Sequence, residues 1–130
     1  MERIDVRNFI DGKWCEQEER TDPLFNPSTG EEIGSVPVSG PATAEAAIAS
    51  AAEAYKSWRL VPIARRVSYL YKIHECMVRD TEALAYSIAV DQAKHISEAR
   101  GEVRRVIEIV EEACSAPALM QGDNLELISS

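Results

Sequence analysis

Residues 98–117, EARGEVRRVIEIVEEACSAP, contain the pattern that decides the fold of this chain. Apolar residues recur there at three- and four-residue spacing, which predicts an amphipathic helix that Pro117 ends. The apolar stripe consists of Ala99, Val103, Val106, Ile107, Val110, Ala113 and Cys114. One side of this helix should therefore pack against the rest of the chain, and its charged side chains are left for solvent or for chemistry.

Three further helices are predicted upstream of this stretch. Residues 41–58, PATAEAAIASAAEAYKSW, are rich in alanine, have proline near the first helical position and contain no glycine. A second helix starts at Pro62 and carries an apolar stripe that includes His74, and a third covers about 81–93. Asp80 and Thr81 separate these two helices, with a stop and a new N-cap. Residues 122–130 resemble the start of a strand.

The N-terminal residues have the features of β-structure. In NFIDGKW, the pair Asp11-Gly12 predicts a two-residue turn, so we expect a β-hairpin over residues 6–16. Ile33, Val36 and Val38 alternate in a further strand. Pro37 indicates that this strand lies at the edge of a sheet or ends at this residue. Residues 1–40 are thus β-rich and residues 41–117 helical. This is an α+β arrangement, and we expect residues 1–130 to form a single segment.

Composition and charge restrict the function classes. The 130 residues are 45% hydrophobic and 28% charged, with a formal net charge of −8, so nucleic acid and anionic membranes are unfavourable partners. No signal peptide or apolar run of about 18 residues is present, which favours a cytoplasmic protein. Cys15, Cys76 and Cys114 are odd in number and widely separated, as expected for free thiols.

The cysteines, histidines and glycines give little sign of chemistry. Cys114 lies on the buried stripe beside Glu111 and Glu112, which favours a core cysteine over a nucleophile. His74 is better explained as a hydrogen-bonded core or interface residue. No spacing predicts a metal site, and no G-x-G-x-x-G or Walker loop predicts a phosphate-binding site, so we expect neither metal ligands nor cofactor-binding residues here.

The arginines differ in their position around the predicted helix. Arg100 and Arg104 share the outer face with Glu108 and Glu111, where exposed ion pairs contribute little. Arg105 lies at the border between the apolar stripe and solvent. The guanidinium of an arginine at such a border can donate two parallel hydrogen bonds to one carboxylate. Spacing alone, however, favours an intrahelical salt bridge.

Several collinear segments together carry a resemblance to a known family. They are NFIDGKW, NPSTGEEIGSVP, AYKSW, PIARRVSYLYKI and ARGEVRRVIEIVEEACSAPALMQGD. In this order they resemble the N-terminal part of the aldehyde dehydrogenase superfamily, which has an α/β fold. The last segment is most similar to methylmalonate-semialdehyde dehydrogenases, which couple NAD-dependent aldehyde oxidation to acylation of CoA. The resemblance implies that Arg105 binds the carboxylate of the substrate.

The sequence departs from the family pattern at three positions. Asp91 and Ala93 stand where the family usually has Glu and Gly, which allows a different turn between the third and fourth helices. Glu112 stands where the family packs an aromatic ring. In the family these helices pack against the nucleotide-binding core, and the following strand enters the oligomerisation sheet.

The resemblance also shows what this chain lacks. Aldehyde oxidation needs a cysteine nucleophile, oxyanion donors, a general base and bound NAD, and the family carries these in later segments. None of the three cysteines matches the nucleophile, so no catalytic residue is expected here. We therefore expect an N-terminal fragment that is inactive alone, binds neither NAD nor CoA tightly, and either forms a homo-oligomer or needs the missing C-terminal part of the dehydrogenase.

Two other classes remain open at this point. The first is a non-catalytic α+β interaction module derived from the same family, which would bind a partner rather than perform chemistry. The second is a thiol redox or metal protein, which the spacing of the cysteines and histidines disfavours. The DNA that follows codon 130 discriminates between fragment and module, because a continuing or frameshifted reading frame with a catalytic-cysteine segment would favour the fragment.

Overall fold

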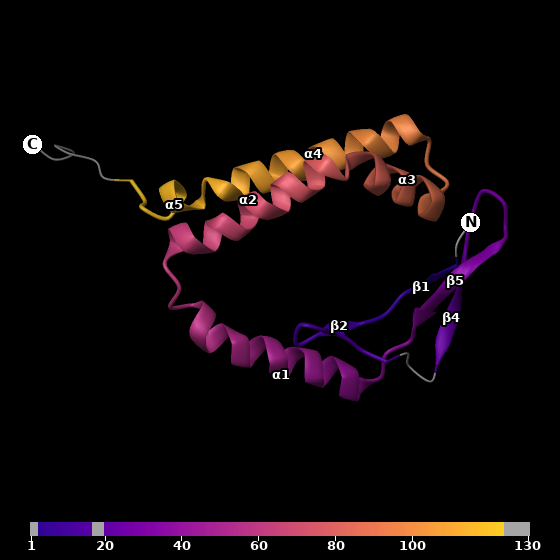
Figure 1. Cartoon of the computed structure of the whole chain (residues 1–130), viewed down its shortest axis with the longest axis horizontal. Coiled ribbons are helices and arrows are strands. Elements are labelled where there is room, and N and C mark those ends of the chain that lie inside the picture. The colour runs from indigo at the N-terminus through magenta and orange to yellow at the C-terminus, as the bar shows by residue number, and fades with distance from the viewer. Residues whose placement is uncertain (1–2, 17–19, 124–130) are drawn as a thin grey trace, which may run out of the picture. The chain divides into compact units, whose positions relative to one another are not determined.

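The computed structural model describes residues 3–16 and 20–123. Their contacts divide them into two compact units. The first comprises the described residues up to Leu60 together with Ser87–His95, and the second comprises Val61–Tyr86 and the described residues from Ile96 onward. Strands precede helices along the chain (Figure 1), so the predicted α+β arrangement is confirmed. The predicted strand at 122–130 lies almost entirely outside the described residues.

A three-stranded sheet in the first unit contains β1 (Ile4–Asp5), β4 (Thr21–Phe25) and β5 (Glu32–Pro37). Its order is β1-β5-β4, with β1 parallel and β4 antiparallel to the central β5. Only β5 was predicted from the alternating apolar residues. Strands β1 and β4 gave no such signal, because both are short and mostly exposed.

Gly34 allows β1 to lie against β5. A Cβ atom placed on Gly34 would come within 1.7 Å of the carbonyl oxygen of Ile4, its partner in the ladder. Next to this contact, the hydroxyl of the buried Ser35 donates a hydrogen bond of 2.8 Å to Asp5. A glycine is therefore required at this position for backbone approach.

Pro37 ends the pairing on this side of β5. The amide of Val6 donates to the carbonyl of Ser35 at 2.9 Å, and the next bond of a parallel ladder would come from the amide of residue 37. Proline has no amide hydrogen, so the ladder stops there. The prediction that Pro37 ends its strand is confirmed, while β5 itself lies at the centre of the sheet.

The predicted hairpin is present, with short strands. β2 (Phe9–Ile10) pairs with β3 (Lys13–Trp14) in antiparallel register. Asp11 and Gly12 form the turn with φ of 54° and 71°, as the Asp-Gly pair predicts. The rings of Phe9 and Trp14 meet edge to face with centroids 5.0 Å apart, which stabilises the pair across the strands.

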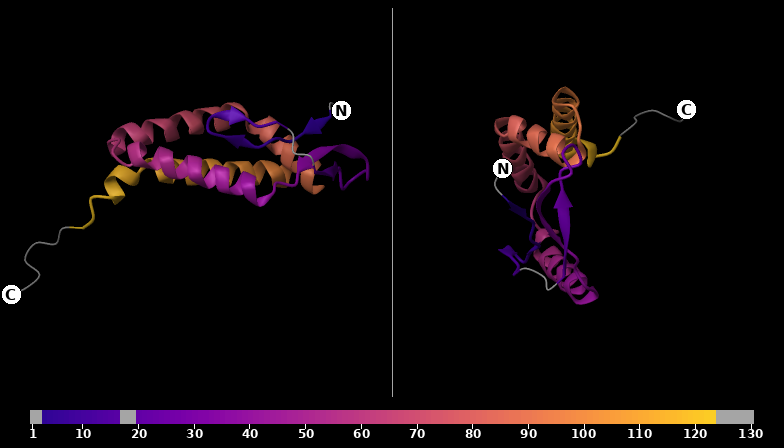
Figure 2. Two further views of the ribbon diagram at one scale, coloured as in Figure 1. Left: turned by 90° about the horizontal axis from the view of Figure 1, so that it is seen from below. Right: turned by 90° about the vertical axis from the view of Figure 1, so that its right-hand side faces the viewer.

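Helix α1 (Pro41–Trp58) coincides with the predicted range. Pro41 lies in its first turn, where the amide that proline lacks would have no helical partner. The helix contacts β2 of the hairpin, and none of its residues is fully buried. Figure 2 shows it as one uninterrupted helix in both views.

The second unit is built on α2 (Ile63–Arg79) and α4 (Ile96–Cys114), which run antiparallel and contact each other (Figure 1). The short α5 (Ala116–Leu119) contacts both. Helix α3 (Thr81–Gln92) contributes residues 81–86 to this unit and its remaining residues to the first. The side chains that pack in the second unit are small: Val67, Ala85, Ala99, Val103 and Cys114.

The helix ends differ in detail from the sequence prediction. Thr81, predicted as an N-cap, donates its hydroxyl to the carbonyl oxygens of Met77 and Val78, so it satisfies the end of α2. Helix α4 ends at Cys114, before Pro117, which lies in the first turn of α5. Ala93 follows α3 with φ of 53°, a left-handed conformation that glycine adopts without strain.

Among the described residues, no helix is both long enough and apolar enough to cross a membrane.

Candidate functional site

The outer side of α4 carries the predicted site residue Arg105. Its side chain is exposed, and within the described residues it makes no hydrogen bond or ion pair. Ile109, one turn further along the same side of the helix, is 67% exposed. The guanidinium is therefore free to bind an anion beside an apolar surface, which is the arrangement that a short aliphatic carboxylate would fit.

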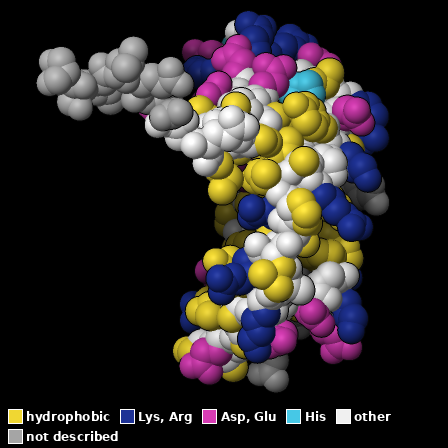
Figure 3. All heavy atoms as spheres, turned by 90° about the vertical axis from the view of Figure 1, so that its left-hand side faces the viewer, with side chains coloured by type: hydrophobic (Ala, Val, Ile, Leu, Met, Phe, Trp, Pro, Cys, Tyr) yellow, Lys and Arg dark blue, Asp and Glu magenta, His cyan; other side chains and the backbone are white. Residues whose placement is uncertain are grey.

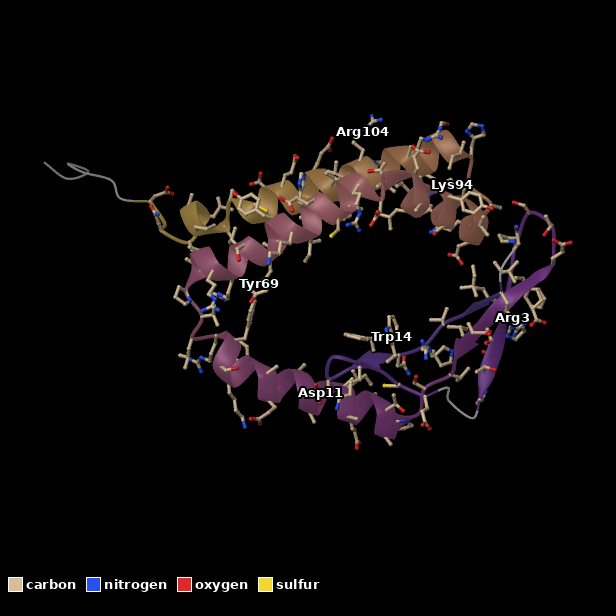
Figure 4. All side chains as sticks on the ribbon, viewed as in Figure 1. Arg3, Asp11, Trp14, Tyr69, Lys94 and Arg104 are labelled. Atoms are coloured by element: carbon tan, nitrogen blue, oxygen red, sulfur yellow. The ribbon has the colours of Figure 1, made fainter. Side chains whose placement is uncertain are left out.

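Arg104 and Arg100 are the other two arginines of α4 considered from the sequence. Arg104, next to Arg105 in the chain, is also exposed, and its side chain points away from α2 (Figure 4). Arg100 binds both carboxylate oxygens of Glu82 on α3, with nitrogen–oxygen distances of 2.8–3.1 Å. This bond lowers the pKa of the Glu82 carboxyl, mainly through the hydrogen bond from Arg100. The predicted intrahelical pairing of Arg100 and Arg104 with Glu108 and Glu111 is thus wrong for Arg100, because Glu82 is within its reach.

A cavity of about 290 Å³ lies beside the contact between α2 and α4. It is lined by Tyr71, His74, Glu111, Cys114 and Ser115. The Nε2 atom of His74 lies 2.9 Å from Oε1 of Glu111, and the His74 side chain is 25% exposed. His74 is therefore the hydrogen-bonded interface residue that its place on the stripe predicted. Glu111 was missed as its partner, because periodicity does not give the register between two helices.

Cys114 is 7% exposed, which confirms the prediction of a core cysteine. Cys15 is half-buried and Cys76 is exposed, and all three cysteines are free thiols. Within the described residues, no group of three or more His, Cys, Asp or Glu side chains is placed to hold a metal ion. On the face in Figure 3, a histidine side chain lies beside acidic and hydrophobic side chains.

A shallow groove runs between the hairpin turn and α1 in the first unit. Its largest part has a volume of about 620 Å³, and it is lined by Ile10, Asp11, Ala46, Ser50, Glu53, Ala54 and Ser57. Asp11, labelled in Figure 4, lies at the turn above this helix. The lining combines small side chains with two carboxylates and contains no cation, so it offers no binding site for the phosphates of a nucleotide.

The glycines test whether these residues fit NAD. A dinucleotide fingerprint needs glycines at a strand-to-helix turn, where the pyrophosphate approaches the backbone. Five of the six glycines have no atom within 4 Å of an added Cβ, and the sixth, Gly34, approaches the backbone of Ile4. Gly101 lies inside α4. Among the glycines of the described residues, only Gly40 lies at a strand-to-helix turn, between β5 and α1, so the three-glycine fingerprint is not formed there.

Known proteins resemble this chain both in sequence and in fold. The model of the aldehyde dehydrogenase family matches residues 14–130. The chain therefore belongs to the aldehyde dehydrogenase family, as its sequence segments indicated.

Two of the curated relatives within this family are malonate-semialdehyde dehydrogenases. Malonate-semialdehyde dehydrogenase 2 of Shouchella clausii is 44% identical over 126 residues, which cover 96% of this chain and 26% of that enzyme. Malonate-semialdehyde dehydrogenase of Bacillus pumilus is 40% identical over 134 residues, covering 100% of this chain and 28% of the enzyme. The chain thus spans about a quarter of the length of the curated relatives that it matches.

Solved structures of methylmalonate-semialdehyde dehydrogenases also align with this chain. A protein of Sinorhizobium meliloti 1021 assigned as a methylmalonate-semialdehyde dehydrogenase, and solved in complex with NAD, aligns with a TM-score of 0.86 and 28% identity. The alignment covers 98% of this chain and 26% of that one. Methylmalonate-semialdehyde dehydrogenase of Oceanimonas doudoroffii aligns with a TM-score of 0.85 and 29% identity over 99% of this chain and 26% of its own.

Proposed function

We propose that this chain is the N-terminal part of an NAD-dependent dehydrogenase that oxidises short semialdehydes carrying a carboxylate, such as malonate or methylmalonate semialdehyde, and transfers the acyl group to CoA. The observation that carries the proposal is the 44% identity to a malonate-semialdehyde dehydrogenase over nearly the whole chain. NAD is bound in a similar solved protein. The use of CoA is inferred from the resemblance to methylmalonate-semialdehyde dehydrogenases, which acylate it.

Arg105 is the proposed binding residue for the substrate carboxylate. It is exposed, makes no bond to another described residue and stands beside the apolar Ile109. A guanidinium in this position can donate two parallel hydrogen bonds to a carboxylate, while the apolar neighbour contacts a short carbon chain. Its role is to bind and orient the substrate, and the oxidation itself requires the nucleophile and NAD of the later family segments.

The 130-residue chain is proposed to be inactive alone and to act in the cytoplasm. The thiols of Cys15, Cys76 and Cys114 are all free, which suits a reducing compartment. The chain would associate either with a polypeptide that supplies the remaining three-quarters of the family fold or with a second copy of itself. Exposed apolar side chains such as Leu60 and Ile109 favour such association.

A complementation assay tests this function. The purified chain is mixed with the later segments of the Bacillus pumilus enzyme, and NADH formation is followed with malonate semialdehyde, NAD and CoA. We expect activity only from the mixture. Turnover by the chain alone would refute its proposed inactivity, and a mixture that assembles without activity would favour the non-catalytic module.

Substrate choice tests Arg105 in the active mixture. Arg105→Leu should lower kcat/KM for malonate semialdehyde about ten- to a hundredfold, the value of a lost charge-assisted hydrogen bond, and should leave propanal oxidation nearly unchanged. Arg104→Leu, on the neighbouring exposed position, is the matched control and should affect neither substrate. An equal loss on both aldehydes after Arg105→Leu would exclude the carboxylate role.

A further inference from the structure

We propose that Gly101 is a specificity-determining residue of the proposed dehydrogenase, because the missing side chain leaves room for the substrate carboxylate beside Arg105. The inference rests on the proposed function, in which Arg105 binds that carboxylate, and it assigns a second residue to the same site. The role of Gly101 is to admit and position the substrate, and it takes no part in the reaction itself.

The first observation is that glycine is an unfavourable residue at this place in the fold. Gly101 lies in the interior of α4, where glycine loses more backbone freedom on folding than any other residue. Outside the backbone of its own helix, a Cβ atom added to Gly101 would meet no described atom within 4 Å. Gly34, in contrast, is explained by the close carbonyl of Ile4. Packing within the described chain therefore does not account for a glycine at position 101.

The second observation is the position of Gly101 relative to Arg105. Gly101 precedes Arg105 by four residues, which is about one turn, so the two lie on the same side of α4. Long side chains of a helix point back towards its N-terminus and cover the preceding turn. The guanidinium of Arg105 therefore lies over the turn that contains Gly101, and a carboxylate bound to it lies at the same level of the helix.

The other neighbours of Arg105 on this side of the helix are larger or charged. Glu102 lies on the opposite flank of Arg105 in the same turn and is engaged in an interaction of its own. Glu108 and Ile109 lie in the following turn. A carboxylate that approaches over Gly101 stays away from both acids, which would repel it, and meets no side chain. The sequence thus leaves an open approach to Arg105 on the flank of the glycine.

A different cause of the glycine is a backbone contact with a later segment of the complete enzyme, like the contact between Gly34 and Ile4. The two causes differ in what a small side chain would do. A backbone contact would exclude any Cβ atom and would disturb the enzyme towards every aldehyde. Room for a carboxylate, in contrast, tolerates a methyl group and is lost with a large side chain, and only substrates that carry a carboxylate are affected.

A series of side-chain sizes tests the proposal in the mixture with the later segments of the Bacillus pumilus enzyme. NADH formation is followed with malonate semialdehyde and with propanal. Gly101→Ala should leave the ratio of the two kcat/KM values nearly unchanged. Gly101→Leu should lower this ratio about tenfold or more, mainly through a higher KM for malonate semialdehyde. Arg104→Leu introduces the same side chain at a neighbouring exposed position and should leave the ratio unchanged.

The stability of the chain alone provides a second readout that needs no activity. Alanine and leucine both favour a helix over glycine, so Gly101→Ala and Gly101→Leu should each raise the midpoint of thermal unfolding by a few degrees. A lower midpoint in Gly101→Ala would show that packing within this chain requires the glycine, and it would overturn the proposal.

The remaining outcomes separate this inference from the proposed function. Equal losses on both aldehydes, or a full loss already in Gly101→Ala, would indicate a backbone contact and overturn the role of Gly101. If Arg105→Leu lowers the ratio and Gly101→Leu does not, Arg105 keeps its carboxylate role and only this inference fails. If Arg105→Leu leaves the ratio unchanged, the carboxylate site itself is wrong, and the role of Gly101 fails with it.

Discussion

Arg100 on α4 binds both carboxylate oxygens of Glu82 on α3, through its Nε and Nη2 nitrogens. The two residues are 18 positions apart in the chain, and the bond joins the start of α4 to the start of α3. It is a bidentate pair on an exposed surface, so solvent and salt weaken it. Its clearest consequence is a dependence of stability on pH.

The pKa of the Glu82 carboxyl is lowered in the folded chain, mainly by the hydrogen bond from Arg100. The pair therefore stabilises the fold at pH values above the pKa of an unfolded glutamate, about 4.3, and this contribution is lost as the pH falls through the lower folded pKa. We expect Glu82→Gln to lower the midpoint of urea unfolding at pH 7 and to have a smaller effect near pH 3. Glu108→Gln is the control and should show no such difference. If the midpoints of the unmodified chain and of Glu82→Gln differ by the same amount at pH 7 and near pH 3, the ion pair with Arg100 is not the cause.

His74 and Glu111 connect α2 to α4 at 2.9 Å. His74→Ala removes this hydrogen bond and part of the packing around the neighbouring cavity, so it should lower the free energy of unfolding by about 1 kcal/mol. His74→Gln retains a donor and should recover part of the loss. Chemical denaturation at pH 7 measures both changes. If the two variants lose the same stability, the hydrogen bond is not the cause.

Gly34 is the position where β1 and β5 come closest. Gly34→Ala would place a methyl group against the carbonyl of Ile4, and the neighbouring backbone cannot move away as a flexible side chain would. We expect a loss of about 1–3 kcal/mol and faster hydrogen exchange of the Val6 amide, which is bonded to Ser35. Gly40→Ala, which meets no atom within 4 Å, should leave both values nearly unchanged. Unaltered protection of Val6 in Gly34→Ala would show that β1 does not need this glycine.

Ala93 adopts φ of 53° between α3 and α4. A left-handed conformation costs a residue with a Cβ atom about 1 kcal/mol relative to glycine. Ala93→Gly should therefore stabilise the chain by about 0.5–1 kcal/mol in thermal unfolding. The same substitution at Ala49, inside α1, should destabilise by about as much, because glycine is unfavourable in a helix. A loss of stability in Ala93→Gly would mean that the alanine methyl group packs favourably there.

The four long helices were predictable from local sequence: α2 and α4 carry periodic apolar residues, α1 is rich in alanine, and Asp80 and Thr81 mark the separation of α2 from α3. α1 has Pro41 in its first turn and a run of alanines, and its bounds agree with the prediction. The Asp11-Gly12 turn was equally clear, since few residue pairs accept two positive φ angles. The α3–α4 turn shows the limit, because Ala93 keeps the conformation of a glycine although its residue type suggested otherwise.

The pairings between distant residues could not be predicted. β1 is two residues long, and what places it in the sheet is the absence of a side chain at Gly34, thirty positions away. Likewise, Arg100 was assigned to acids of its own helix, because periodicity describes one helix and not its neighbour. The carboxylate role of Arg105 came from a resemblance and remains a proposal, although the structure shows that its side chain is exposed.

Pro23 lies in the middle of β4, the outer strand of the three-stranded sheet. The amide of Val38 donates to the carbonyl of Arg20. Because only every second residue of an antiparallel strand bonds to its neighbour, Pro23 falls in a pair without hydrogen bonds, and its backbone nitrogen faces the open edge. That edge therefore lacks a donor at its centre, and another chain cannot extend the sheet across it. A newly synthesised chain is therefore protected on this side from edge-to-edge aggregation into fibrils.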